Sequence, residues 1–178
     1  MSLTKSIRKT NVYAIGGIAV ILGFATKLAS GVNALTITRT GSPINGPITG
    51  LALAAGVEVV RLEFEENEAL FSDNTTFGAN KFPKHQLGMK FNGRDATRNE
   101  VIQSLDLERN TFLAKLHSGQ VVLLGGVNGL TGEKSDSGAG AKAEDFFGYD
   151  VLLSGAELEK APVVPEAEFV EFAALVAA

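Results

Sequence analysis

The chain has 178 residues, of which 45% are hydrophobic and 20% are charged. This balance is typical of one globular domain and not of an intrinsically disordered chain. A net charge of −4 gives no chain-wide basic field to hold nucleic acid, and the absence of cysteine excludes disulfides and thiolate metal sites.

The first segment joins a basic start to an apolar run. Lys5, Arg8 and Lys9 precede Val12–Ala25, an order that imitates a secretion signal. The run is shorter than the about 20 apolar residues that a membrane-spanning helix needs, and three glycines interrupt it. We therefore expect no signal peptide and no membrane insertion. The prediction is a polar arm over residues 1–10, followed by a buried strand.

Short strands separated by turns are predicted next. Ala34–Arg39 contains β-branched residues and Ile48–Ala54 is apolar, with turn signals between them at Gly41-Ser-Pro and Asn45-Gly-Pro. Both runs have the length of short strands. No role is predicted for residues 31–56, which contain them.

Three further runs predict an antiparallel sheet with one face in solvent. Val57–Glu65 alternates apolar and charged residues, with Val60, Leu62 and Phe64 on the apolar face. Ala69–Phe77 is expected to be its polar-edged partner. The alternation returns in the run that carries Leu87, Met89 and Phe91, so that one face of this sheet is expected to be wet.

One helix is predicted, over about residues 95–108. Asp95 is a suitable N-cap, because its carboxylate can accept a backbone N–H of the first turn. Val101, Ile102 and Leu105 follow at a spacing that places an apolar stripe on one side of a helix. This side is expected to face the core.

Two hairpins are predicted after the helix. Thr111–Leu116 and Val121–Val127 flank a turn at Ser118-Gly119. Val121–Val127 and Tyr149–Ser154 in turn flank a tip rich in glycine, serine, alanine and lysine, which predicts a long hairpin with a poorly packed tip. The tail, Glu168–Ala178, is apolar enough to need a surface, either as a last strand or as an arm on another subunit.

No residue set for catalysis stands out. The stretch Gly126–Ser135 superficially resembles a phosphate-binding loop, but Glu133 separates the glycine from the lysine and would repel a phosphate. His85 and His117 have no metal-ligand spacing and are both expected at the surface. We therefore expect a protein that is not an enzyme and that has no catalytic residue, no metal and no cofactor.

An acidic cluster follows the first alternating run, and it consists of Glu63, Glu65, Glu66, Glu68 and Asp73. Paired carboxylates can bind Ca²⁺ or Mg²⁺ or act as general acid and base, but no calcium-loop motif and no nucleophile accompany them. A solvated sheet face is the simpler interpretation. A third interpretation is a face kept negative so that it does not hold passing DNA.

The order of these features resembles the tail-tube (major tail) proteins of tailed bacteriophages, and more closely the virion structural proteins of phages that infect Bacteroidetes. Two short landmarks are the strand start at Gly16–Ile18 and the loop at Phe82-Pro83-Lys84. The longer landmarks are RLEFEENEALF at Arg61–Phe71, LGMKFNGRDATRNEV at Leu87–Val101, VVLLGGVNGL at Val121–Leu130 and DFFGYDVLLSGAELEKAPVV at Asp145–Val164. The likeness is one of pattern over most of the chain and rests on no single signature.

This resemblance implies a single mainly β domain, an antiparallel β-sandwich or barrel of tail-tube type with one helix. It implies hexameric rings that stack into a tube for DNA passage in the virion, made in the host cytoplasm. The implied partners are other copies of the chain, other tail proteins and DNA that passes without specific binding.

Arms and loops would then bridge neighbouring subunits, over residues 1–10, Thr75–Gln86, Gly132–Ala143 and 165–178. The expected contact residues are Phe77, Phe82, Lys84, Phe169, Phe172 and Leu175. The expected lumen-facing residues are Glu63, Glu65, Glu66 and Glu68.

Two alternatives remain open at the level of sequence. Another virion component, such as a tail terminator, an adaptor ring or a capsid decoration protein, would stop at one ring or one lattice contact. A small-ligand-binding β-barrel would instead be a monomer with an apolar cavity and a few inward polar anchors.

Overall fold

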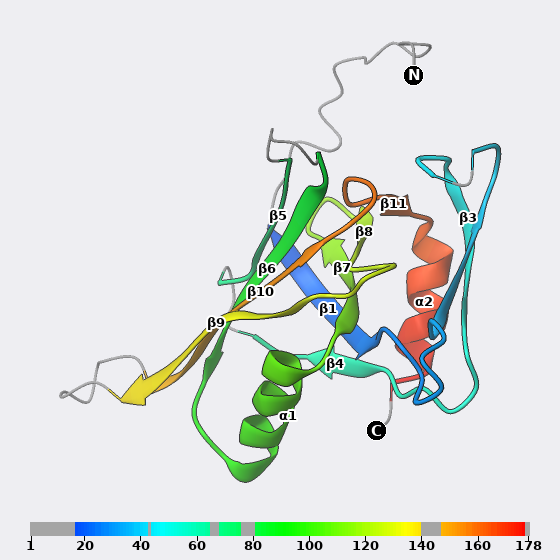
Figure 1. Ribbon diagram of the computed structural model, residues 1–178. Coiled ribbons are helices and arrows are strands. Elements are labelled where there is room, and N and C mark those ends of the chain that lie inside the picture. The colour runs from blue at the N-terminus through cyan, green and yellow to red at the C-terminus, as the bar shows by residue number, and fades with distance from the viewer. Residues whose placement is uncertain (1–16, 43, 65–67, 76–80, 140–146, 177–178) are drawn as a thin grey trace.

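The computed structural model describes residues 17–42, 44–64, 68–75, 81–139 and 147–176 (Figure 1). The fold is mainly β with antiparallel pairing throughout its sheets, as the sequence predicted. Its elements are β1 (Ile18–Ala25), β2 (Leu35–Arg39), β3 (Ile48–Leu53), β4 (Val60–Leu62), β5 (Leu70–Thr75), β6 (Pro83–Asn92), α1 (Ala96–Leu107), β7 (Asn110–Leu116), β8 (Val121–Leu124), β9 (Thr131–Ala139), β10 (Phe147–Ala156), β11 (Val163–Val164) and α2 (Glu166–Ala174).

The described residues form three layers (Figure 1). A five-stranded sheet of order β11-β8-β7-β1-β4, the middle sheet, lies in the centre. A four-stranded sheet of order β5-β6-β10-β9, the outer sheet, packs on one of its faces. The two-stranded β2–β3 sheet and α2 cover its other face.

The main core lies between the middle and outer sheets. Phe112 and Leu124 of the middle sheet and Leu87, Val151 and Leu153 of the outer sheet are fully buried there. Burial in β6 alternates residue by residue along the whole strand. The predicted alternation of the Leu87–Phe91 run is therefore confirmed, with its apolar side facing this core.

A second core lies between the middle sheet and the third layer. Leu113 and Leu123 of the middle sheet meet Leu51 of β3 and the phenyl rings of α2. The ring centroids of Phe24 and Phe172 are 5.5 Å apart. Residues 31–56, for which the sequence predicted no role, thus supply part of the cover that buries the middle sheet on its second face.

Helix α1 forms where it was predicted. Asp95 caps it, because its side chain accepts a hydrogen bond from the backbone N–H of Arg98 at 2.7 Å. Ile102 and Leu105 are buried in the main core, and Val101 is half-buried beside them. The helix begins at Ala96 and ends at Leu107, so that it closes one end of the space between the two sheets.

The predicted pairing of the acidic alternating run with Ala69–Phe77 was wrong. The run forms only the short β4, which pairs with β1, whereas Leu70–Thr75 forms β5 and pairs with β6. Leu62 and Phe71 both reach the main core, but they reach it from opposite sheets. The chain therefore crosses from one sheet to the other between these strands, and Val60, predicted on the apolar face, is exposed.

The hairpin turned at Ser118-Gly119 is confirmed as β7–β8, but the predicted long hairpin was wrong in its first strand. β8 ends at Leu124 in the middle sheet, and β10 pairs instead with β9, which is built from TGEKSDSGA. This polar run forms a strand because β10 satisfies its backbone while its side chains stay in water. The remaining tip, residues 140–146, lies outside the described residues.

The tail was predicted as a last strand or an arm on another subunit, and it is neither. Glu166–Ala174 forms helix α2, whose Phe169 and Phe172 are buried against the chain's own middle sheet. An N–H of β3 anchors the helix, since Leu51 donates its backbone hydrogen to a carboxylate oxygen of Glu168 at 2.8 Å. Within the described ranges, no helix is long and apolar enough to cross a membrane.

Candidate functional site

The solvent side of the outer sheet is the most distinctive surface of the described residues. In β6 the residues between the buried ones, from Lys84 to Lys90, are half-buried and point away from the core. The strand register places Asp150 beside Lys90 and Ser154 beside Gln86. This surface, called here the free face, carries polar side chains from all four strands, whereas the opposite side of the same sheet is apolar.

Opposite charges are paired across the free face. The ammonium nitrogen of Lys90 lies 2.6 Å from a carboxylate oxygen of Glu68, and that of Lys84 lies 2.8 Å from one of Glu133. In β9, Lys134 and Asp136 are paired at 2.5 Å. With Asp150, the described residues place four carboxylates and three lysines on or beside this face, a net charge of −1. The face is therefore polar and close to neutral.

These contacts shift the pKa values of three charged groups of the face toward their ionised forms. Hydrogen bonds from Lys84, Ser154 and Gln86, in that order of strength, lower the pKa of Glu133 to about 2. The hydrogen bond to Glu68 raises the pKa of Lys90. Asp136 raises the pKa of Lys134 in the same way. Glu133 is thus ionised at any pH at which the protein would ordinarily work.

Neither edge strand of the outer sheet has a strand partner on its outer side in the described part of the chain, although α1 packs against the Thr131–Gly132 end of β9. β5 pairs only with β6, and β9 pairs only with β10. Leu70, the first residue of β5, has 60% of its surface exposed, which is high for a leucine in a strand. An edge strand presents unpaired backbone N–H and C=O groups, and these can pair with a strand of another molecule.

The structure separates the predicted lumen-facing residues. Glu68 lies beside the free face, where it pairs with Lys90. Glu63 follows β4 of the middle sheet and lines a surface hollow with Phe64. Glu65 and Glu66 lie outside the described residues. Glu63 and Glu68 therefore lie beside different sheets, and the carboxylates that share the free face with Glu68 are Glu133, Asp136 and Asp150.

The predicted contact residues are also divided. Phe82 is 50% exposed at the start of β6, Leu175 is 56% exposed at the end of α2, and Lys84 is part of the free face. Phe169 and Phe172 are buried in the chain's own second core. They are not available to a neighbouring subunit in this conformation, which corrects the prediction. Phe77 lies outside the described residues.

His85 was predicted at the surface and is instead buried, whereas His117 is exposed as predicted. The Nδ1 atom of His85 accepts a hydrogen bond from the backbone N–H of Gly125 at 3.3 Å. Its Nε2 atom lies 2.8 Å from the carbonyl oxygen of Glu159, to which it donates in the tautomer that this arrangement requires. The imidazole thus joins β6 to the loop after β8.

A second buried polar group was not found by sequence reasoning. The carboxylate of Glu157 accepts hydrogen bonds from the backbone N–H groups of Val127, Asn128 and Gly129, at 3.3, 2.9 and 3.2 Å to the nearest oxygen. Nearby, Arg39 forms an ion pair with Glu159. Glu157 fixes the loop between β8 and β9, and the Arg39–Glu159 pair joins β2 to the segment after β10. No motif in the sequence distinguishes these groups from surface charges.

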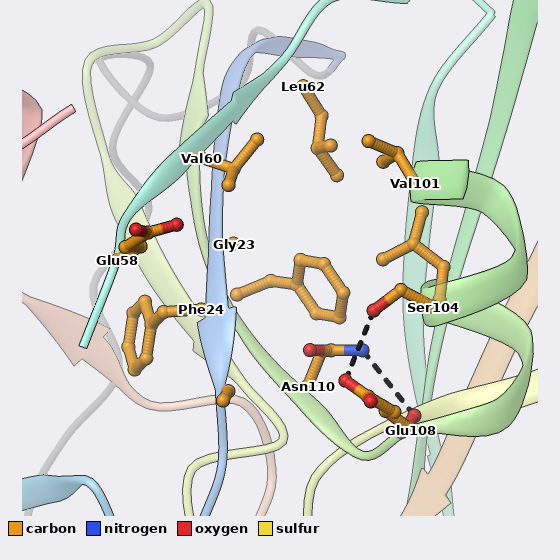
Figure 2. Close-up of a pocket in the computed structure, with 12 residues that line it drawn as sticks. Gly23, Phe24, Glu58, Val60, Leu62, Val101, Ser104, Glu108 and Asn110 are labelled. Atoms are coloured by element: carbon orange, nitrogen blue, oxygen red, sulfur yellow. Dashed lines mark hydrogen bonds between the residues drawn. The ribbon is translucent and has the colours of Figure 1, made fainter. Parts of the chain in front are cut away.

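The described residues contain no group of three or more histidine, aspartate or glutamate side chains that could hold a metal ion. Away from the free face, a hollow of about 190 Å³ lies between β4 and α1 (Figure 2). Val60 and Leu62 line one side of it, and Val101 lines the other.

The comparisons with known proteins give no family for this chain. No family model matches it, and neither the curated proteins nor the solved structures contain a match. Inferences about function therefore rest on the geometry of the outer sheet and on the sequence resemblance.

Proposed function

We propose that the chain is a structural virion protein that assembles into rings through the edges of its outer sheet, and that the rings stack into a phage tail tube. The observation that carries this proposal is the outer sheet itself, in which two edge strands lack an outer strand partner among the described residues and one polar face is uncovered. Strands β6 and β10 pair over nine residues, from Lys84 to Asn92, which gives a long and continuous sheet.

Edge pairing between copies would use the outer side of β5 and the part of β9 beyond its contact with α1. Joining β5 of one copy to β9 of the next uses a different edge on each copy, and such a head-to-tail contact closes into a ring when the rotation is right. The sheets of successive copies would then form one closed barrel, in which no edge is left unpaired. The free face would become the wall of its channel.

The charges of the free face suit a channel that DNA passes through. Its lysines are paired with carboxylates, and the net charge of the described residues is −1. DNA binding gains free energy when unpaired cations replace the counterions of its phosphates. A wall with paired lysines offers little such gain, so the DNA is not held during transit.

Of the alternatives, a terminator or adaptor ring uses the same edges but stops at one ring. A small-ligand-binding barrel is not proposed, because the side chains between the two sheets, among them Leu87, Phe112 and Val151, are fully buried. This region is therefore a packed core rather than a ligand cavity.

The first test is assembly of the purified chain across a range of concentrations, measured by size-exclusion light scattering and negative-stain electron microscopy. Tubes or stacked rings support the proposal, and discrete single rings favour the terminator or adaptor. A chain that remains monomeric at every concentration contradicts assembly through the sheet edges.

A proline pair in β9 tests which edge is used. Successive N–H groups of an edge strand point alternately toward its partner and away from it. Of Ser135→Pro and Asp136→Pro, one therefore removes a bond to β10, and the other removes only an outward N–H. The variant that keeps wild-type stability should remain monomeric. Assembly of that variant at the wild-type concentration would exclude β9 as the joining edge.

The role of the free face can be tested on assembled tubes. Replacing Glu133, Asp136 and Asp150 with lysine leaves both edge backbones unchanged but gives the face a surplus of positive charge. We expect these tubes to retain DNA at low salt and to release it as salt rises. Wild-type DNA transit through the lysine tubes would mean that this face does not line the channel.

A further inference from the structure

Three hollows lie in succession along β4, the edge strand of the middle sheet. Their volumes are about 330, 260 and 190 Å³. Leu62 lines all three. The first contains Ile18, where β1 begins, and the third contains Glu58, so the hollows follow the strand from one end to the other.

The third hollow combines an apolar floor with an acidic rim (Figure 2). Phe112 closes its base, and the exposed carboxylates of Glu58 and Glu108 stand at its mouth. Ser104 donates a hydrogen bond to Glu108 at 3.1 Å, whereas Glu58 has no hydrogen-bond or ion-pair partner among the described residues. Its lining includes no lysine, arginine or histidine. Such a site fits the apolar stem and cationic head of a lysine or an arginine.

The chain carries a segment of complementary charge outside the described residues. Residues 1–16 contain Lys5, Arg8 and Lys9 and no aspartate or glutamate, and residues 11–16 are uncharged. The middle hollow carries both signs of charge with a surplus of cations, since Arg61, Arg98 and Glu63 line it. A segment in which the uncharged residues 11–16 adjoin the middle hollow would bring the basic residues to the acidic third hollow. This order is favourable because it places opposite charges together.

The length of the segment matches the length of the hollows. Ile18 lines the first hollow and Phe24 lines the third, and both belong to β1. A strand rises about 3.3 Å per residue, so these two residues are about 20 Å apart along β1. Arg8 and Gly17 are nine residue steps apart, enough for about 30 Å of extended chain. Gly17 has a φ of +87°, a left-handed conformation that only glycine adopts readily and that suits a change of direction.

We propose that residues 1–16 fold back along β4 of their own chain and place Arg8 and Lys9 at the acidic hollow between β4 and α1. The segment then covers the open edge of the middle sheet. Beside Val59, the edge is already bridged to Val176, so the segment adds cover to the rest of β4. This assignment does not depend on the proposed tube function, because it concerns contacts within one copy.

Trypsin tests the assignment directly, because it cleaves after Lys5, Arg8 and Lys9. The full chain, at concentrations where it is monomeric, is treated with trypsin, and the first cleavages are followed by mass spectrometry. We expect the Glu58→Gln/Glu108→Gln variant to be cut in this segment about fivefold faster than wild type, since the loss of two ionic contacts raises the undocked population. Glu100→Gln is the matched control, since Glu100 is an exposed carboxylate of α1 outside the three hollows.

Equal cleavage rates in the wild type, the double variant and the control would overturn the proposal. Protection that appears only as concentration rises would also overturn it, because the segment of a neighbouring copy would then occupy the hollow. Protection that is independent of concentration and is lost only in the double variant supports it. If assembly fails in the tests above but this protection is found, the tube proposal falls and this one stands.

Discussion

The middle and outer sheets differ in how many of their faces are covered. All four residues of β8 in the middle sheet are buried, whereas burial in β6 of the outer sheet alternates along ten residues. The middle sheet has the outer sheet on one face and α2 with β2–β3 on the other. The polar residues of the free face follow the two-residue period of the strand. This pattern is the one expected for a sheet that packs on one face and meets solvent on the other.

The largest expected effect comes from two pairs of adjacent leucines. Leu123→Ala and Leu124→Ala in β8 remove side chains from the two opposite cores, so each should cost about 2–5 kcal/mol. In β10, Leu153→Ala should lower the free energy of unfolding by a similar amount. Leu152 lies on the free face, so Leu152→Ala should lower it by less than about 1 kcal/mol. Urea denaturation of the monomer measures all four. An equal cost for both β10 variants would mean that the free face is covered.

This difference between the sheets was partly readable from the sequence. The alternation at Leu87–Phe91 correctly predicted a sheet with one wet face, and the Asp95 cap correctly predicted α1. The run at Val121–Leu124 has no alternation, which fits burial on both faces but does not name the covering layers. The predicted pairing of the β4 run with the β5 run was wrong, because local sequence patterns do not encode which distant strand lies alongside.

A smaller effect is expected where a polar side chain joins the two sheets. His85→Ala leaves the backbone N–H of Gly125 without its buried acceptor and should cost about 1–3 kcal/mol. His117→Ala is the matched control, because His117 is exposed and its loss should change stability little. Thermal unfolding of both variants gives the comparison. Similar losses would show that the imidazole of His85 contributes no more than a surface side chain.

Buried polar groups were the part of the molecule that sequence reasoning missed. His85, Glu157 and Arg39 are placed by long-range contacts with Gly125, the 127–129 loop and Glu159. Polar residues are most often exposed, so a surface position is the usual expectation for each of these three side chains. Only the fold brings an acceptor such as the Glu157 carboxylate to three backbone N–H groups that need one.

Two glycines of β9 show that the same outer strand is packed at one end and free at the other. A Cβ on Gly132 would lie 2.9 Å from Cα of Asp106 in α1, whereas one on Gly138 would meet nothing within 4 Å. Gly132→Ala should therefore cost about 1–3 kcal/mol through a backbone shift, and Gly138→Ala should be close to neutral. Urea denaturation distinguishes the two. A neutral Gly132→Ala would mean that β9 can move away from α1 without loss.

The smallest effect concerns the charge pairs of the free face. The pKa of Glu133 is lowered to about 2 from an ordinary 4.5, so its stabilising contribution is complete above about pH 4.5 and is lost as pH falls toward 2. Lys84 and Glu133 have 42% and 38% of their side chains exposed, so the contribution should stay below about 1 kcal/mol. Glu133→Gln should thus be slightly less stable than wild type at pH 6, with the difference vanishing near pH 2. A constant difference from pH 6 to 2, measured by urea denaturation, would assign the loss to packing instead. The charge pairs of the free face are thus weak, and the middle sheet, buried on both sides, supplies the stability that this face does not.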